Sequence, residues 1–422
     1  MKKNMRGGVV LPDVLTKHTA WEQPFQPITP TRLILSLGSG GLAPLVKVGK
    51  RVLVGQRVAE DPEAVCPPLH SGVSGRVLAV EEVHPDAEGG FSAAIIIEND
   101  GENAAGSWLA PLSENSSPAQ VVERMYEAGL VGMGGAGFPT YRKYDGVQAR
   151  CLLINLCECE PYLAGDVRLA LEQAVTLAEG ARWLARAAGI SEIGVCVCTE
   201  SPAAAQAMKA AGLPAVCLPT RYPQGAERQL IAAVLHREVP AGRYPAEEGI
   251  MVSNGATAVA MAEAVRGLPL THRSLTISGW VEQPVNCLVP IGTPFEELAT
   301  LVKPTQPRMR YIAGGPMTGR RLTTLQIGVP KTCGGLILLP GLSEPETPCI
   351  RCGGCVRVCP AGLMPFRIEE ELLAEELVQC DHLRATACIS CGCCSYVCPA
   401  HRQLAARIGA ARRLIREREA TA

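Results

Sequence analysis

The chain has 422 residues, which is enough for two to four domains with separate hydrophobic cores. Its 40 Lys and Arg residues nearly balance its 41 Asp and Glu residues, so no overall field favours binding to nucleic acid or to an anionic membrane. Gly (43) and Pro (33) are abundant while aromatic residues make up 4%, which favours short strands and turns over a long helical bundle. The composition therefore predicts a multidomain protein without a nucleic-acid partner.

The 19 cysteines raise the question of the redox compartment. The N-terminal residues form only a short apolar patch that Pro12 and Asp13 interrupt, unlike a secretory leader. We therefore expect a cytosolic chain, where grouped cysteines are metal ligands rather than disulfides. The longest uncharged apolar runs, such as 336–339, are far shorter than the roughly 20 residues that span a bilayer. Any membrane attachment is expected to come from other subunits.

Residues 1–105 are predicted to form an all-β domain, because short β-type runs alternate there with Gly, Pro and Asp. The phrases at 46–59 and 66–77 resemble the barrel-sandwich hybrid of biotinyl and lipoyl carrier domains. Those carriers modify a lysine at the hairpin tip, whereas the matching stretch here is Leu69-His70-Ser71-Gly72. We therefore expect an unmodified domain with a structural or docking role.

After a polar linker at 101–118, residues 117–268 are predicted to form an α/β domain with a largely parallel sheet. The expected helices lie at 119–128, 167–188, 203–211 and 256–265, and the expected strands at 151–155 and 193–198. Residues 270–341 return to β-type sequence and predict a small mixed domain, with strands at 274–281 and 334–339 and a short acidic helix near 294–301. Residues 345–422 are rich in cysteine and predicted to be helical, ending in a basic helix at 403–418.

The motif C-x2-C-x2-C-x3-C-P occurs twice, at Cys349, Cys352, Cys355 and Cys359 and again at Cys388, Cys391, Cys394 and Cys398. In bacterial two-cluster ferredoxins the first three cysteines of each run bind one [4Fe–4S] cluster and the fourth binds the other. We therefore predict one cluster on Cys349, Cys352, Cys355 and Cys398, and a second on Cys388, Cys391, Cys394 and Cys359. Zinc is the alternative, but zinc sites use two C-x2-C pairs. Cys380 and Cys393 fall outside the pattern, and we expect Cys393 to be a spare thiol.

A glycine-rich segment at 129–140 is followed by Lys143. Closely spaced glycines let backbone N–H groups approach a phosphate or a flat ring, and a nearby lysine neutralises phosphate charge. Taken alone, this loop fits a tight turn packed on the sheet equally well.

A resemblance favours the first interpretation. The string G-x-G-G-A-G-F-P-T-x-x-K at 132–143 resembles the flavin-binding loop of the NADH-oxidising flavoprotein subunit of respiratory complex I and of its relative RnfC, a component of the Rnf electron transport complex. The resemblance continues with N-x-x-E-C-E-P-Y at 155–162, Y-P-x-G-x-E at 222–227 and N-x-x-T at 254–257, and residues 314–317 fall in what resembles the β-grasp (SLBB) domain of these proteins. It covers nearly the whole chain.

This resemblance implies an FMN site and an NADH site. The residues implied for FMN are Gly132, Gly134, Gly135, Gly137, Lys143, Asn155, Asn254 and Thr257, and those implied for NADH are Glu158, Glu160 and Glu227. For Glu158 and Glu160 a solvated strand end is the alternative. Cys157 stands where complex I has Asp. No catalytic acid or nucleophile is expected, because a flavin converts the two-electron hydride of NADH into single electrons for the clusters.

The family further implies a peripheral subunit on the cytoplasmic side of the inner membrane, in an Rnf-type complex that couples electron transfer to ion translocation. Its partners would be the other subunits and, indirectly, ferredoxin or flavodoxin. Three alternatives remain: a cobalamin reductase, whose β domain follows the clusters instead of preceding the flavin loop; a soluble paralogue that feeds a dedicated reductase; and an electron relay without nucleotide binding. The loose match of residues 6–12 to the family's G-G-I-H-P-P opening is compatible with a paralogue.

Overall fold

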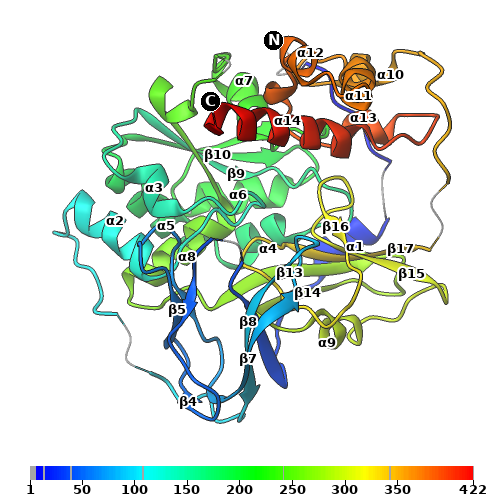
Figure 1. Cartoon of the computed structure of the whole chain (residues 1–422). Coiled ribbons are helices and arrows are strands. Elements are labelled where there is room, and N and C mark those ends of the chain that lie inside the picture. The colour runs from blue at the N-terminus through cyan, green and yellow to red at the C-terminus, as the bar shows by residue number, and fades with distance from the viewer. Residues whose placement is uncertain are drawn as a thin grey trace.

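The computed structural model describes residues 6–12, 15–38, 40–106, 109–240, 242–341 and 344–421. It shows a multidomain α/β chain whose strands form four sheets, followed by a helical C-terminal part. Figure 1 shows this helical part in orange and red beside the green α/β unit, and Gln229 of that unit donates a hydrogen bond to Pro360 O across the boundary. None of the described helices combines the length and apolar character needed to cross a bilayer.

The N-terminal strands form two antiparallel sheets, ordered β2-β8-β7-β4 and β3-β5-β6. Their bounds are Arg32–Ser36 (β2), Ala43–Pro44 (β3), Arg51–Val52 (β4), Arg57–Glu60 (β5), Leu69–His70 (β6), Gly75–Pro85 (β7) and Phe91–Asn99 (β8). Leu33 and Leu35 of β2 lie opposite Ile97 and Ile95 of β8, and all four side chains are buried. The strands are those of an all-β unit, and their buried residues form one continuous core with those of the α/β unit.

Residues 15–27, which lie inside the range 1–105 predicted for the first domain, do not join these two sheets. Helix α1 (Leu15–Glu22) packs on β13 (His272–Gly279), and β1 (Phe25–Pro27) pairs in parallel with β14 (Val285–Pro290) of the third unit. The buried amide of Asn286 in β14 donates to Ala20 O at 2.6 Å and to Gln23 O at 2.9 Å. A buried amide needs such acceptors, and the N-terminal segment provides them.

The α/β unit is built on a parallel sheet ordered β11-β10-β9-β12. Its strands are Cys151–Leu156 (β9), Glu192–Cys198 (β10), Ala215–Leu218 (β11) and Ile250–Asn254 (β12), and its helices are Pro118–Glu127 (α2), Thr140–Tyr144 (α3), Gly165–Glu172 (α4), Ala174–Ala187 (α5), Pro202–Ala210 (α6), Glu227–Leu235 (α7) and Gly255–Val265 (α8). Leu152 and Ile154 of β9 pack in the same core as α5 and α8, whereas Cys151 and Leu153 pack in the core that contains α7. Helices therefore cover both faces, as parallel sheets require.

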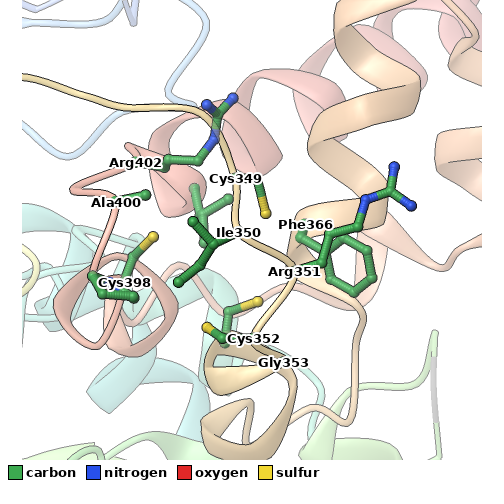
Figure 2. Close-up of a pocket in the computed structure, with 12 residues that line it drawn as sticks. Cys349, Ile350, Arg351, Cys352, Gly353, Phe366, Cys398, Ala400 and Arg402 are labelled. Atoms are coloured by element: carbon green, nitrogen blue, oxygen red, sulfur yellow. The ribbon is translucent and has the colours of Figure 1, made fainter.

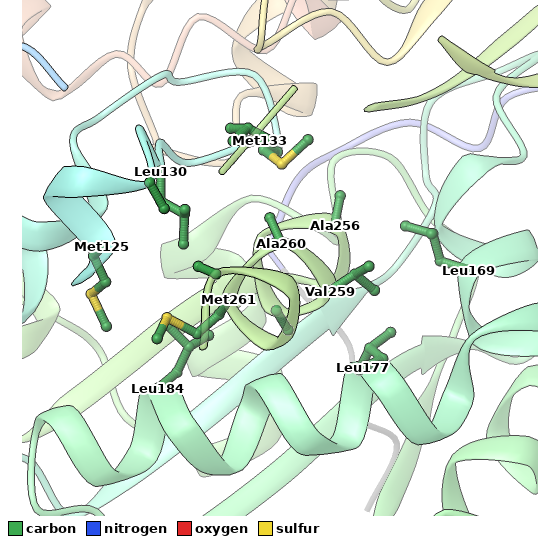
Figure 3. Close-up of a cluster of buried hydrophobic side chains, with 14 of the residues drawn as sticks. Met125, Leu130, Met133, Leu169, Leu177, Leu184, Ala256, Val259, Ala260 and Met261 are labelled. Carbon is green, nitrogen blue, oxygen red and sulfur yellow. The ribbon is translucent and has the colours of Figure 1, made fainter. Parts of the chain in front are cut away.

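Helices α5 and α8 approach each other closely in this core (Figure 3). Leu177 and Leu184 of α5 and Val259 and Met261 of α8 belong to one buried cluster. Gly180 permits the approach, because a β-carbon at this position would lie 1.7 Å from Ala258 O. This contact fixes α8, and with it the position of Asn254 at the end of β12.

Two stretches of helical pattern are each divided into two helices. The predicted helix at 167–188 is α4 followed by α5, because Gln173 between them has a φ of −128°. The segment between the cysteine runs, within the range 345–422 predicted to be helical, forms α11 (Pro365–Leu373) followed by α12 (Leu377–His382), with Glu375 at a φ of +61° between them. The apolar pattern continues across both breaks, so periodicity alone does not reveal them.

The third unit holds a mixed sheet ordered β1-β14-β13-β17-β15-β16. Its elements are His272–Gly279 (β13), Val285–Pro290 (β14), Phe295–Ala299 (α9), Met309–Ala313 (β15), Arg320–Arg321 (β16) and Gly335–Pro340 (β17). Leu275, Val289, Phe295 and Leu336 form part of its core. The strands expected at 274–281 and 334–339 and the short helix expected near 294–301 correspond to β13, β17 and α9.

The C-terminal part contains short helices around the two cysteine runs and one long helix. They are Gly354–Val358 (α10), α11, α12, Cys393–Tyr396 (α13) and Leu404–Thr421 (α14). Glu369 of α11 is only 2% exposed, and its carboxylate accepts hydrogen bonds from Arg402 and Arg407. This paired buried charge ties α14 to the rest of the cysteine-rich part.

Candidate functional site

The two cysteine runs fold into loops of the same conformation. Arg351 and Ser390 occupy equivalent positions and have left-handed φ values of 54° and 55°. Gly353 and Gly392, two residues further on, have φ values of 69° and 77°. A short helix follows each loop. The repeated sequence C-I-x-C-G-x-C therefore produces a repeated backbone path.

Each loop receives its fourth cysteine from the other run. One hollow is lined by Cys349, Cys352, Cys355 and Cys398 (Figure 2), and the other by Cys359, Cys388, Cys391 and Cys394. These are the two groups of four that the sequence proposes; their role as cluster ligands stays a prediction. We call them the first and the second cysteine group.

Backbone amides point at two of the sulfurs. Leu363 N donates to Cys359 Sγ at 3.3 Å, and Ser390 N donates to Cys388 Sγ at 3.4 Å. Within the described residues, no three Cys, His or acidic side chains converge on the position of a single ion. A [4Fe–4S] cluster does not need such convergence, because each thiolate binds its own iron. The donor set and its arrangement fit a four-iron cluster in each hollow.

The second group faces the α/β unit, and the first faces outward. Cys393 beside the second group is buried, with its Sγ 4.0 Å from Tyr222 O. A β-carbon on Gly392 would lie 2.5 Å from Met317 O, so the loop touches the third unit as well. Cys349 and Cys352 of the first group are exposed.

The glycine-rich loop runs from β-bridge residue Val131 to its partner Pro139. Gly132 N donates to Phe138 O at 2.8 Å, and Gly137 N donates back to Gly132 O at 3.1 Å. Gly137 has a φ of +65°, and a β-carbon on it would lie 2.9 Å from Thr332 Cγ2. Residues 134–136 at the tip are exposed, and their N–H groups make no hydrogen bond within the described part of the chain. The loop therefore offers a row of free amides beside the start of α8.

The structure pairs Lys143, implied for FMN, with Glu227, implied for NADH. Lys143 Nζ lies 2.8 Å from Glu227 Oε1 and donates to Val252 O at 2.7 Å. Both side chains are partly exposed, so the ion pair is open to a ligand. The FMN site and the NADH site implied by the resemblance therefore meet at this ion pair.

Three further residues implied for FMN hold the backbone around the loop. Thr257 Oγ1 accepts a hydrogen bond from Met133 N at 3.0 Å. Asn155 donates to Gly225 O at 2.8 Å, and Asn254 caps α8 by accepting from Ala256 N. Asn155 and Asn254 are register partners on adjacent strands, at the carboxyl edge of the sheet where ligands of parallel α/β sheets bind.

Glu158 and Glu160, implied for NADH, are deeper than a solvated strand end. Glu158 Oε2 accepts from Asp166 N at 2.5 Å, and the side chain is 8% exposed. The carboxylate of Glu160 accepts from Met317 N at 3.1 Å and Thr318 Oγ1 at 2.6 Å. Burial raises the pKa of both carboxyls. Glu160 therefore links the site to the third unit, and its role toward NADH stays a prediction.

Sequence reasoning missed three polar residues around this site. Asp166 bonds to Asn254, Lys17 donates to the carbonyl oxygens of Glu158 and Glu160, and Lys331 donates to Gly129 O at 2.7 Å at the start of the loop. Lys17 and Lys331 lie far away in sequence, so no local motif marks them. Asp166 could have been found from the sequence, because it closely follows the N-x-x-E-C-E-P-Y motif and lies at the start of a helix.

Comparison with known families finds matches for the N-terminal β unit and for the α/β unit. Residues 3–102 match the RnfC barrel sandwich hybrid domain, and residues 125–263 match the Nuo51 FMN-binding domain. A crystal structure of NAD⁺-reducing [NiFe]-hydrogenase in the air-oxidised state is similar in fold, with a TM-score of 0.50 and 21% identity over 71% of this chain and 66% of that one. The fold and the matches define a class of multidomain α/β proteins with an FMN-binding domain of the Nuo51 type.

Curated relatives identify the family within this class. The C subunit of the ion-translocating oxidoreductase complex of Rhodobacter capsulatus is 38% identical over 79% of this chain and 68% of its own length. The C subunit of the Na(+)-translocating ferredoxin:NAD(+) oxidoreductase complex of Acetobacterium woodii is 39% identical over 88% of this chain and 87% of its own length. The chain belongs to the RnfC family, and the family resemblance stated from the sequence is confirmed.

Proposed function

We propose that this chain is the NADH-interacting RnfC component of an Rnf-type ion-translocating complex and passes electrons between NAD(H), FMN and two [4Fe–4S] clusters. The observation that carries the proposal is that two features of the chain lie against the same α/β unit. A glycine-rich loop with free amides lies on the sheet of the α/β unit, and the second cysteine group contacts the same unit through Cys393 and Tyr222.

The exposed tip of the glycine-rich loop suits FMN. Its free amides lie beside the start of α8, where backbone N–H groups favour a bound phosphate. Lys143 supplies a positive charge after the loop, and Gly134 brings the loop close to Asn254, since a β-carbon on it would lie 3.2 Å from Asn254 Cβ. The bound flavin would supply the conversion of a two-electron hydride into single electrons.

The two cysteine groups would carry electrons away from the flavin, one cluster after the other. The second group, whose neighbour Cys393 lies beside Tyr222, would hold the cluster nearer the flavin, and the first, with exposed Cys349 and Cys352, would hold the cluster nearer the protein partner. We propose residues 345–422 as a two-cluster ferredoxin-type domain and residues 270–341 as a β-grasp domain. Cys393 remains a thiol without a cluster.

The partners proposed are the other subunits of the membrane complex. The Acetobacterium relative is named as part of a ferredoxin:NAD⁺ oxidoreductase complex, so we propose ferredoxin or flavodoxin as the indirect electron partner. A peripheral position on the cytoplasmic side of the inner membrane fits a chain that binds a nicotinamide cofactor.

Anaerobic purification followed by titration with NADH tests the proposal. We expect bound flavin, bleaching of its absorbance by NADH, and reduced-cluster EPR signals. A protein that carries iron and sulfide, lacks flavin and does not respond to NADH would instead be an electron relay. Clusters without any NADH response in flavin-loaded protein would contradict the dehydrogenase role.

A further inference from the structure

The segment near the N-terminus passes between the cysteine-rich part and the α/β unit. Gly8 N donates to Val358 O, at the end of α10, at 2.8 Å. The next residue, Val9, forms an antiparallel bridge with Tyr222, in which Val9 N donates to Tyr222 O at 2.8 Å and Tyr222 N donates to Val9 O at 2.9 Å. Two successive residues are therefore bonded to two different units. We call residues 7–9 the N-terminal strap.

On one side the strap lies against the backbone of Cys359, a member of the second cysteine group. A β-carbon on Gly7 would lie 2.7 Å from Cys359 O and 2.9 Å from Val358 O. Gly7 and Gly8 have left-handed φ values of 63° and 75°, which glycine adopts without strain. Only a glycine at position 7 leaves room for this contact with the peptide of a predicted cluster ligand.

On the other side the strap reaches the border of the proposed flavin site. Val9, which is 6% exposed, forms one buried cluster with Tyr222 and Cys393. Three residues after Tyr222, the carbonyl of Gly225 accepts a hydrogen bond from Asn155 at 2.8 Å. Asn155 is one of the residues implied for FMN. The strap therefore connects the second cysteine group to the segment that borders this site.

The direct contacts between the two units are weaker than those of the strap. Within the described residues, no backbone hydrogen bond joins the cysteine-rich part to the α/β unit directly. Gln229 Nε2 lies 3.4 Å from Pro360 O, and Cys393 Sγ lies 4.0 Å from Tyr222 O. Both distances exceed the usual range of a strong hydrogen bond, whereas the three backbone bonds of the strap lie within it.

We propose that Gly7, Gly8 and Val9 are positioning residues that hold the second cysteine group at a fixed place against the α/β unit. The strap acts through its contacts with Cys359 and Tyr222. The consequence of this inference rests on the proposed function: the rate of electron transfer from the flavin to the second cluster depends on the strap, because this rate falls steeply as the distance between donor and acceptor grows.

Hydrogen exchange of the anaerobic protein, loaded with flavin and iron, tests the contact itself. In G7A we expect faster exchange at the amides of Gly8, Val9 and Tyr222, because the added carbon would meet Cys359 O and displace the strap. G38A is the matched control, since Gly38 has a φ of +62° and nothing lies within 4 Å of the added carbon. It should leave these three amides as protected as in wild type.

Stopped-flow reduction by NADH separates positioning from a purely structural role. In G7A the flavin should be reduced at the wild-type rate, whereas the reduction of the clusters that follows should slow several-fold. V9A should show the same split to a smaller extent, because it shortens a side chain packed in the cluster with Tyr222 and Cys393. V10A alters a neighbour that is 76% exposed and should behave as wild type. If G7A is recovered without iron, V9A and V10A carry the comparison.

The outcomes separate this inference from the proposed function. Wild-type exchange at the three amides in G7A, or faster exchange with an unchanged rate of cluster reduction, would overturn the role of the strap. If NADH leaves the flavin of the wild type oxidised, the proposed function fails, and the exchange comparison of G7A with G38A still decides whether the strap holds the two units together.

Discussion

Lys143 and Glu227 form an ion pair, with Lys143 Nζ 2.8 Å from Glu227 Oε1, between helix α3 after the glycine-rich loop and the first residue of α7. The family resemblance gives the lysine to FMN and the glutamate to NADH. In the folded chain the two side chains are in contact. A substitution of either residue is therefore expected to affect the binding of both FMN and NADH.

Replacing Lys143 by Met is expected to weaken FMN binding about tenfold or more, because a charge-assisted contact to phosphate is lost, at a cost of roughly 1.4 kcal/mol. Fluorescence titration of deflavinated protein with FMN measures the change. K47M removes an exposed lysine of the N-terminal β unit and should leave FMN affinity unchanged. Equal FMN affinities for K143M and wild type would refute the assignment of Lys143 to the flavin.

Single cysteine variants test the crossed cluster ligands. C398S is expected to disturb the first cluster and C359S the second, each lowering bound iron by up to about half, because each cluster needs four thiolates. EPR of the reduced proteins should lose a different signal in each case. C393S should keep all the iron, since Cys393 Sγ is directed toward Tyr222 O instead. Loss of the same signal in C398S and C359S would contradict the crossing.

Gly137 tests the shape of the loop. G137A is expected to lower FMN affinity, because alanine is strained at a φ of +65° and its β-carbon would press on Thr332 at 2.9 Å. G146A is the matched control, with a φ of +66° but open space around the added carbon. Both variants should lose about 1 kcal/mol of stability from backbone strain. Only G137A should release flavin on gel filtration, and equal retention by the two variants would count against the loop as the flavin site.

Lys331 is expected to make stability depend on pH. Its ammonium is buried against Pro68 O and Gly129 O, and burial lowers its pKa from 10.5 to about 7. Because the unfolded chain binds the proton more tightly, the contribution of Lys331 to stability is full above pH 10.5 and is lost as pH falls toward 7. Wild type should therefore gain up to about 1.4 kcal/mol per pH unit from this group as pH rises through that window.

Anaerobic urea unfolding at about pH 7.5 and about pH 9.0, both within the window, measures this slope. K331M should lack it and should be less stable by about 2–4 kcal/mol, since two buried carbonyls lose their donor. K209M, at an exposed position of α6, should retain the wild-type slope. A K331M protein with the same pH slope as wild type would show that another group titrates.

The cysteine motif, the glycine-rich loop and the alternation of strands and helices at 151–265 were all readable from the sequence. Each is a local pattern: the spacing of C-I-x-C-G-x-C dictates its own loop, and the apolar period of a helix or strand follows from its own geometry. The family could be stated on such strings, and the strands predicted at 151–155 and 193–198 lie within one residue of β9 and β10 at each end.

Only the tertiary structure decided what lies between these patterns. Residues 15–27 join the third unit, where they provide acceptors for the buried amide of Asn286. No local sequence pattern predicts this contact. Lys17 reaches Glu158 across 141 residues of sequence, and Lys331 reaches Gly129 across 202. Asp166 reaches the loop through Asn254, which stands at the end of another strand. Their positions depend on packing and on the satisfaction of buried polar groups, which sequence periodicity does not encode.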